Sequence, residues 1–260
     1  MTIKKFQILI LAILLFASFV YSQKQPDGLE IIKKVYNRET GNDQTAQLTM
    51  TLIDSRGNKR VRTIKQLLQN GKKVEKKIMF FVSPADVRNT SFMNWSYSKE
   101  GKSDDQWIYL PALKRVKRIS SDSKSDYFMG SDFTYDDLGD RQPAADNHKF
   151  LKMEKIGNDE CFVIESKPKE EDYMYSKTIT WVIKDKWIGK KKEFYDEDGE
   201  LLKILEVKDY KKINGYWIIL HSEMKNVQKK HSTEMSLKGV KINTGITDRQ
   251  FTERMMKRGI

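Results

Sequence analysis

A period-two alternation of apolar and polar residues is the feature that most constrains what this chain can fold into. The first clear run places Ala46, Leu48, Met50 and Leu52 on one side of an extended segment. Successive side chains of a strand point to opposite faces, so this run predicts a strand with one covered face. Similar runs occur between residues 59 and 110 and between residues 149 and 242, and short turn sequences separate them. Runs joined in this way predict an antiparallel meander.

The number of these runs indicates the fold class. About ten or eleven strands with few helices are typical of an α+β, mainly β domain built on a barrel or a sharply curved sheet. Two helices are predicted, at residues 26–39 and 247–257. In each of them apolar residues recur at helical spacing along one side. The two helices and a long central loop are the natural covers for one face of the sheet.

The first 22 residues are predicted to be a secretory signal peptide. Lys4 and Lys5 precede an apolar run from Phe6 to Val20, and a plausible cleavage point follows Ser22. The apolar run is short for a bilayer span, and polar sequence follows it at once. A retained N-terminal anchor is the alternative. The mature chain is therefore expected to be secreted across the inner membrane, with cleavage near Ser22.

Residues 23–260 are expected to form a single domain, because no Pro/Gly/Ser-rich linker divides them. A monomer is expected as well. The net charge of +12 includes two lysines of the signal peptide. In a secreted chain, positive charge suits an anionic membrane surface or lipid better than nucleic acid. Cys161 is the one cysteine, so no intramolecular disulfide is possible. The apolar residues that follow it predict a buried, unreactive thiol.

The segment from residue 107 to residue 140 carries the most unusual sequence. It begins with an aromatic-apolar strand, continues with the basic residues Lys114, Arg115, Lys117 and Arg118, and ends in an aromatic and acidic stretch. Long ordered loops inside compact domains are usually functional. The large aromatic residues Phe128, Phe133 and Tyr135 argue against disorder.

Two blocks of this segment resemble the outer membrane lipoprotein-sorting protein family, the LolA/LolB-like group of periplasmic proteins. The first block is Trp107-Ile108-Tyr109-Leu110-Pro111-Ala112-Leu113-Lys114-Arg115-Val116 followed by Arg118-Ile119, and the second runs from Phe128 to Leu138. The resemblance extends more loosely over residues 25–255. It implies a strongly curved antiparallel sheet, an incomplete barrel, whose concave face is covered by helices and a long loop. It also implies that acyl chains are held in an apolar cavity without a cofactor.

The resemblance directs attention to two sets of residues. Lipid contact is predicted for the large apolar residues of the segment, namely Trp107, Tyr109, Leu110, Phe128, Met129 and Phe133. Contact with lipid headgroups or a partner protein is predicted for Lys114, Arg115, Lys117 and Arg118. An edge strand protected by positive charge is the other interpretation of this basic run.

Catalytic and metal-binding patterns are not evident in the sequence. His148, His221 and His231 lie far apart, and no GxSxG motif or phosphate-binding glycine loop occurs. The aspartates between residues 122 and 140 miss the spacing of a calcium loop. For them we expect a short helical turn capped by Ser131 or Thr134, with Asp136 and Asp137 in its first turn, and ion pairs with the basic run. No enzyme activity and no metal are predicted.

The cargo sets the kind of site that is needed. Exposing an acyl chain of about 16 carbons to water costs on the order of 10 kcal/mol, at about 0.8 kcal/mol per methylene. A few surface side chains cannot keep an acyl chain of that length out of water, so the site must be an enclosed groove. We therefore expect a periplasmic carrier of lipoprotein or lipid acyl chains, in peripheral contact with membranes, that acts between an inner-membrane exporter complex and an outer-membrane acceptor. The alternative is a periplasmic sensor or interaction module on the same fold that does not transport.

Overall fold

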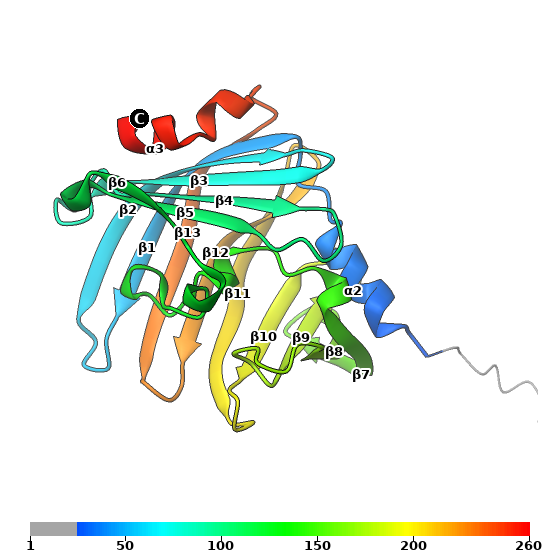
Figure 1. Cartoon of the computed structure of the whole chain (residues 1–260). Helices are drawn as coiled ribbons and strands as arrows, with labels where there is room; N and C mark the ends of the chain where they lie inside the picture. The colour runs from blue at the N-terminus through cyan, green and yellow to red at the C-terminus, as the bar shows by residue number, and fades with distance from the viewer. Residues whose placement is uncertain (1–24) are drawn as a thin grey trace, which may run out of the picture.

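One antiparallel sheet forms the wall of the molecule in the computed structural model, which describes residues 25–260 (Figure 1). The predicted signal peptide, residues 1–22, lies outside the described residues. The strands are β1 (Asp43–Ile53), β2 (Lys59–Asn70), β3 (Val74–Ser83), β4 (Ser91–Tyr97), β5 (Asp105–Leu110), β6 (Arg115–Arg118), β7 (Asp146–Ile156), β8 (Asp159–Pro168), β9 (Lys177–Ile183), β10 (Gly189–Tyr195), β11 (Leu201–Ile213), β12 (Tyr216–Asn226) and β13 (His231–Ile242).

The order of the strands confirms the predicted open, curved sheet. It runs β6-β5-β4-β3-β2-β1-β13-β12-β11-β10-β9-β8-β7, so β6 and β7 are edges that do not pair with each other. β1 pairs with β13 in the middle of the sheet, and among the described strands the connection from β6 to β7, which contains most of the central segment, is the one that crosses from one edge of the sheet to the other. The sheet curls around a hollow without closing into a barrel (Figure 1).

The two sides of the sheet bury different clusters, as the alternation predicts. In β3, Met79 and Phe81 join the cluster of the concave face, while Ile78 and Phe80 join a second cluster on the outer face. The thirteen-stranded sheet exceeds the predicted count mainly because β6 was expected to be part of a loop. The rest of the central segment holds short 3-10 turns at Pro111–Leu113, Ser121–Ser123, Phe128–Gly130, Asp136–Leu138 and, just beyond it, Pro143–Ala145.

The first helix, α2 (Gly28–Tyr36), covers one end of the concave face. Asp27 caps it by accepting a hydrogen bond from the Leu29 N–H, as the sequence predicts. Ile31 is buried against Ile164 and Val182 of the sheet. Gly28 permits this close approach, since a Cβ atom there would lie 3.0 Å from backbone atoms of β7. A larger residue at position 28 would push the helix away from the sheet.

The C-terminal helix, α3 (Glu253–Arg258), lies on the outer face, where the sequence had suggested a cover for the concave one (Figure 1). A 3-10 turn, Asp248–Gln250, precedes it. Phe251 and Met256 pack on the outer side chains of β3 and β4, and the Ser91 hydroxyl donates a hydrogen bond to the Met256 carbonyl at 3.0 Å. Sequence alternation identifies two faces but does not tell which of them curves inward. No helix within residues 25–260 is both long and apolar enough to cross a bilayer.

Candidate functional site

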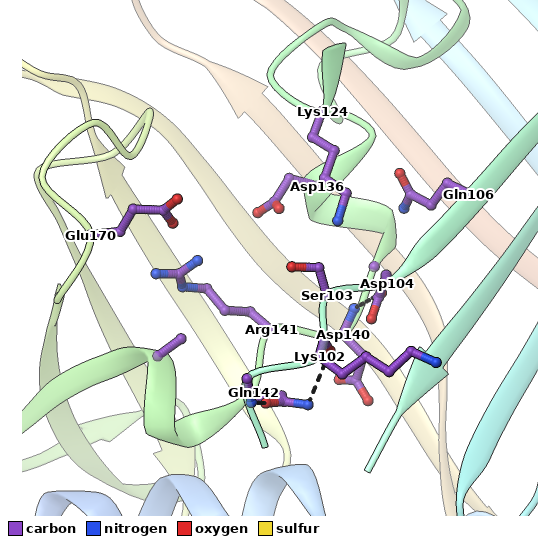
Figure 2. Close-up of a pocket in the computed structure, with 13 residues that line it drawn as sticks. Lys102, Ser103, Asp104, Gln106, Lys124, Asp136, Asp140, Arg141, Gln142 and Glu170 are labelled. Atoms are coloured by element: carbon purple, nitrogen blue, oxygen red, sulfur yellow. Dashed lines mark hydrogen bonds between the residues drawn. The ribbon is translucent and has the colours of Figure 1, made fainter. Parts of the chain in front are cut away.

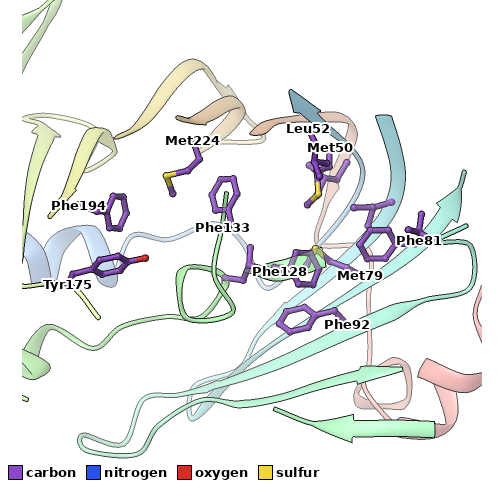
Figure 3. Close-up of a cluster of buried hydrophobic side chains, with 14 residues drawn as sticks. Met50, Leu52, Met79, Phe81, Phe92, Phe128, Phe133, Tyr175, Phe194 and Met224 are labelled. Carbon is purple, nitrogen blue, oxygen red and sulfur yellow. The ribbon is translucent and has the colours of Figure 1, made fainter. Parts of the chain in front are cut away.

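The segment from Tyr127 to Leu138 enters the hollow of the sheet. Phe128 is fully buried there, with its ring centroid 5.1 Å from that of Phe92 and 6.0 Å from that of Phe81. Phe133 lies between this group and a second group that contains Phe194 and Met224 (Figure 3). The segment is thus part of the core and at the same time a wall for the space beside it.

Backbone hydrogen bonds give the segment a defined shape. The Phe128 N–H donates to the Phe133 carbonyl at 2.7 Å, and Tyr127 bridges to Thr134 in an antiparallel sense. Side chains of the sheet then bind the outside of this small loop. The Arg62 guanidinium donates to the Met129 carbonyl at 2.7 Å, and the Gln106 amide donates to the Tyr135 carbonyl at 2.8 Å.

A buried ion pair fixes the segment to β11. Lys203 Nζ lies 2.5 Å from Asp137 Oδ2, and their side chains are 0% and 5% exposed. Asp137 also accepts hydrogen bonds from the Thr134 N–H at 2.7 Å and from the Tyr175 hydroxyl at 3.1 Å. A buried charge is stable only when it is paired and hydrogen-bonded, and this carboxylate is both.

The other aspartates of the segment serve as anchors as well. Asp132 accepts a hydrogen bond from the Thr233 hydroxyl at 2.7 Å, and Asp136 accepts one from the Tyr173 hydroxyl. Burial raises the pKa of both carboxyls. The predicted turn is confirmed at Asp136–Leu138, and Thr134 Oγ1 accepts from the Asp137 N–H at 3.1 Å, although the cap position itself is Tyr135. The predicted ion pairs with the basic run do not occur among the described residues: Asp132 and Asp136 turn inward, and the exposed Asp122 and Asp126 pair with none of its cations.

A cavity of about 440 Å³ remains between this segment, α2 and the sheet. Its size falls within the range of about 300–1,000 Å³ that is usual for small-molecule sites. The apolar part of its lining comes from α2, from the segment and from strands β10 to β12, namely Ile32, Val35, Phe133, Phe194, Leu205 and Met224. Lys192 also lines it, and burial lowers the pKa of that ammonium group.

On its acidic side the cavity adjoins a smaller polar pocket of about 220 Å³ (Figure 2). The two spaces share Asp136, Gly139, Asp140 and Arg141. Burial raises the pKa of Asp140 to about 7, and the neighbouring carboxylates of Glu75 and Asp104 add to the rise while Lys77 opposes it. Arg141 pairs with Asp146 at 2.6 Å and stacks on the ring of Tyr173. The whole space is therefore amphipathic.

The structure separates the six residues predicted to contact lipid. Phe133 lines the cavity, and Phe128 and Met129 belong to the core next to it. Leu110 is half-buried at the end of β5. Trp107 and Tyr109 lie on the outer face, where they pack with the cluster under α3. Lipid contact by these two residues stays a prediction and requires a ligand at that second face.

The basic run forms the edge strand β6 and the residue before it, which agrees with the alternative interpretation of an edge strand protected by positive charge. Arg115, Lys117 and Arg118 are exposed on β6, and Lys114 precedes it. Arg118 pairs with Asp105 of the neighbouring strand. Contact of these four residues with headgroups or a partner stays a prediction.

Sequence reasoning did not single out most of the residues that line the cavity. Phe194 and Leu205 read as ordinary strand residues until the register of β10 and β11 brings them to the cavity, whereas Met224 belongs to the methionines whose flexible side chains suit a deformable cavity. Lys203 offered a signal, since it interrupts an apolar alternation between Leu201 and Leu205. Cys161 is fully buried and burial raises its pKa to about 11, which confirms the predicted inert thiol. Within residues 25–260 no group of three or more potential metal ligands gathers.

Three solved structures share this architecture. A domain from Vibrio parahaemolyticus assigned to outer membrane lipoprotein sorting is 36% identical, with a TM-score of 0.83, over 89% of this chain and 98% of that one. A DUF1329 family protein from Desulfovibrio piger is 27% identical, with a TM-score of 0.82, over 88% and 97%. A LolA superfamily protein from Nitrosomonas europaea is 17% identical, with a TM-score of 0.67, over 88% and 99%, and this likeness concerns the fold alone.

Two sequence comparisons complete these findings. A family model whose description reads only "uncharacterized protein" matches residues 73–258. No curated protein matches the chain.

Proposed function

The chain belongs to the outer membrane lipoprotein-sorting protein family, and from this premise we propose that it is a periplasmic carrier of acyl chains. The chain of a lipoprotein or lipid would lie in the cavity between α2, the 127–138 segment and strands β10 to β12. From there it would be delivered toward the outer membrane. No covalent step is involved.

The observation that carries the proposal is the amphipathic cavity itself. Packed protein interiors leave few voids larger than a water molecule, whereas this space measures about 440 Å³. Apolar side chains of three neighbouring strands form one wall, and α2 forms another. Burying hydrocarbon against them yields about 25 cal/mol per Å² of surface removed from water. A long acyl chain bound there would gain several kcal/mol.

The placement of α2 supports exchange of cargo. The helix is held on one side by Ile31 and by the close approach of Gly28 to β7, while Ile32, Val35 and Tyr36 face the cavity. It is a short amphipathic cover and not part of the sheet. Cargo can therefore enter or leave through a shift of one element, with the sheet unchanged.

Transfer of a fluorescent lipid between two vesicle populations tests this function. Leu205→Trp would fill the cavity from β11, and Leu151→Trp is the matched control because Leu151 is exposed on the edge strand β7. We expect the wild type and Leu151→Trp to transfer lipid and Leu205→Trp to lose most of the transfer. Equal transfer by both variants would contradict the proposal. Binding without transfer in the wild type would favour the sensor.

A further inference from the structure

The concave face of the sheet changes from apolar to polar between neighbouring rows of β3, β4 and β5. One row consists of Met79, Phe92 and Ile108, which pair across the strands. The next rows contain Lys77, Asn94 and Gln106, then Glu75 and Ser96, beside which lies Asp104. We call these six residues, Glu75, Lys77, Asn94, Ser96, Asp104 and Gln106, the polar ladder. Asp104 and Gln106 of the ladder line the smaller pocket, while Glu75 and Lys77 line the larger cavity.

Two buried oxygens of the ladder receive no hydrogen bond from the described residues. Asn94 and Gln106 are each 1% exposed, and the unpaired atoms are Asn94 Oδ1 and Gln106 Oε1. Their amide nitrogens are engaged, in Asn94 with Ser96 Oγ at 2.8 Å and in Gln106 with the Tyr135 carbonyl at 2.8 Å. Turning either amide over would break these bonds. The Gln106 amide points from β5 into the pocket (Figure 2).

Two carboxylates, those of Asp104 and Asp140, line the same pocket as Gln106, and the Asn94 amide also donates to Asp104 Oδ2 at 3.3 Å. Asp140 lines both cavities, and its N–H donates to Asp104 Oδ2 at 2.8 Å. Position 139 must be glycine for this contact, because a Cβ atom there would lie 2.6 Å from Asp104 Oδ2. Among the described residues, neither Asp140 nor Glu75 forms an ion pair. Lys77 is the one cation on the ladder, and its Nζ donates to the Leu138 carbonyl at 3.2 Å.

A ligand for such a pocket must donate hydrogen bonds and carry positive charge. A primary ammonium group does both, with three N–H donors on a compact cation. A buried acceptor without a donor is destabilising, and an ammonium group removes that cost while it neutralises a carboxylate. Lys102 and Lys124 line the outer part of the same pocket, where they suit the phosphate of a headgroup.

We propose that Gln106, Asp104 and Asp140 in the smaller pocket bind the ammonium group of an amine-bearing lipid headgroup, while the acyl chains of the same molecule occupy the larger cavity. This inference rests on the proposed carrier function. The two spaces meet at Asp136, Gly139, Asp140 and Arg141, so one lipid can reach both. The carrier then selects its cargo by the headgroup.

Competition between phospholipids with identical acyl chains tests the inference on the wild-type protein alone. Phosphatidylethanolamine, its N-trimethylated counterpart and phosphatidylglycerol are offered together, and bound lipid is counted by native mass spectrometry. We expect the primary amine to be preferred about tenfold, which is the usual worth of a buried charge-assisted contact. Equal uptake of the three lipids overturns the inference but leaves the carrier function standing. Uptake of none of them overturns the carrier function.

Two variants locate the preference. Asp140→Asn should lose the tenfold preference, while Asp122→Asn, which removes the same charge from an exposed turn, should keep it. A preference unchanged in Asp140→Asn would overturn the assignment to this pocket. Free ethanolamine distinguishes the source of the amine. If it removes the preference at the same uptake, the site reads the ammonium alone; if it has no effect, the site requires the amine on a lipid.

Discussion

Replacing Lys203 by methionine should strongly destabilise the protein. The substitution keeps most of the side-chain volume and removes the charge that pairs with Asp137 in the core. Asp137 would then be a buried carboxylate without a cation. It would retain only the hydrogen bonds from the Thr134 N–H and the Tyr175 hydroxyl.

The contacts of Lys203 set the size of the effect. Removing one partner of a buried ion pair typically costs about 3–5 kcal/mol, because the other charge is left uncompensated. The Lys203 ammonium also lies 5.0 Å from the ring centroid of Tyr175 and 5.1 Å from that of Phe194. The two remaining hydrogen bonds of Asp137 offset part of the loss. We therefore expect the free energy of unfolding to fall by about 3 kcal/mol.

Urea unfolding of four proteins measures this interaction as a double-mutant cycle. Lys203→Met and Asp137→Asn should each be destabilising, and the double variant should lose about 2 kcal/mol less than their sum, because neither charge is then stranded. Lys208→Met on the same strand is the control. That lysine is exposed, so its loss should cost under about 0.5 kcal/mol. The reasoning is refuted if Lys203→Met behaves like the control or if the two single effects simply add.

Three further predictions follow from other parts of the molecule. Folding raises the pKa of Asp140 from 3.8 to about 7, so the ionisation of this carboxyl opposes folding more and more as pH rises between these values. In chemical unfolding, Asp140→Asn should therefore raise the free energy of unfolding by about 2 kcal/mol at pH 8 and by less at pH 5. The control Glu170→Gln should show no such difference between the two pH values. Trp107→Ala should lower the melting temperature through its contacts under α3 and leave lipid uptake unchanged; a loss of uptake without a loss of stability would instead place lipid on the outer face. The secreted protein should begin at Gln23, and a mass that includes residues 1–22 would contradict the predicted cleavage.

The sequence predicts the sheet well because period-two alternation is a local signal. For β6 the sequence offers an edge strand only as an alternative interpretation, because Arg115, Lys117 and Arg118 are exposed and only Val116 packs on the outer cluster. Such a strand is held mainly by its backbone pairing with β5 and gains protection from its charges. The sequence correctly identifies the central aromatic residues as ordered, but it does not predict which of them lie on the concave face and which on the outer face. Trp107 and Ile108 are adjacent in sequence and lie on opposite sides of the sheet.

The site depends on contacts between residues that are distant in sequence. Lys203 and Asp137 are 66 positions apart, and Asp132 and Thr233 are 101 positions apart. Secondary-structure propensity and sequence motifs predict neither contact, because the residues of each pair come together only when the register of β11, β12 and β13 is fixed. The polar ladder is similar, since its six residues become neighbours only across three strands. Local patterns thus predict the wall, whereas the cavity is a property of the assembled sheet.

A native mass spectrum of the secreted protein, purified without detergent extraction, tests the cavity as an acyl-chain site most directly. The account predicts a bound species whose mass corresponds to an acyl-bearing lipid or lipopeptide on the wild type and on Leu151→Trp. The same species should be absent from Leu205→Trp, provided that this variant is folded by circular dichroism. A wild-type protein that carries no lipid and takes up none from vesicles would contradict the account.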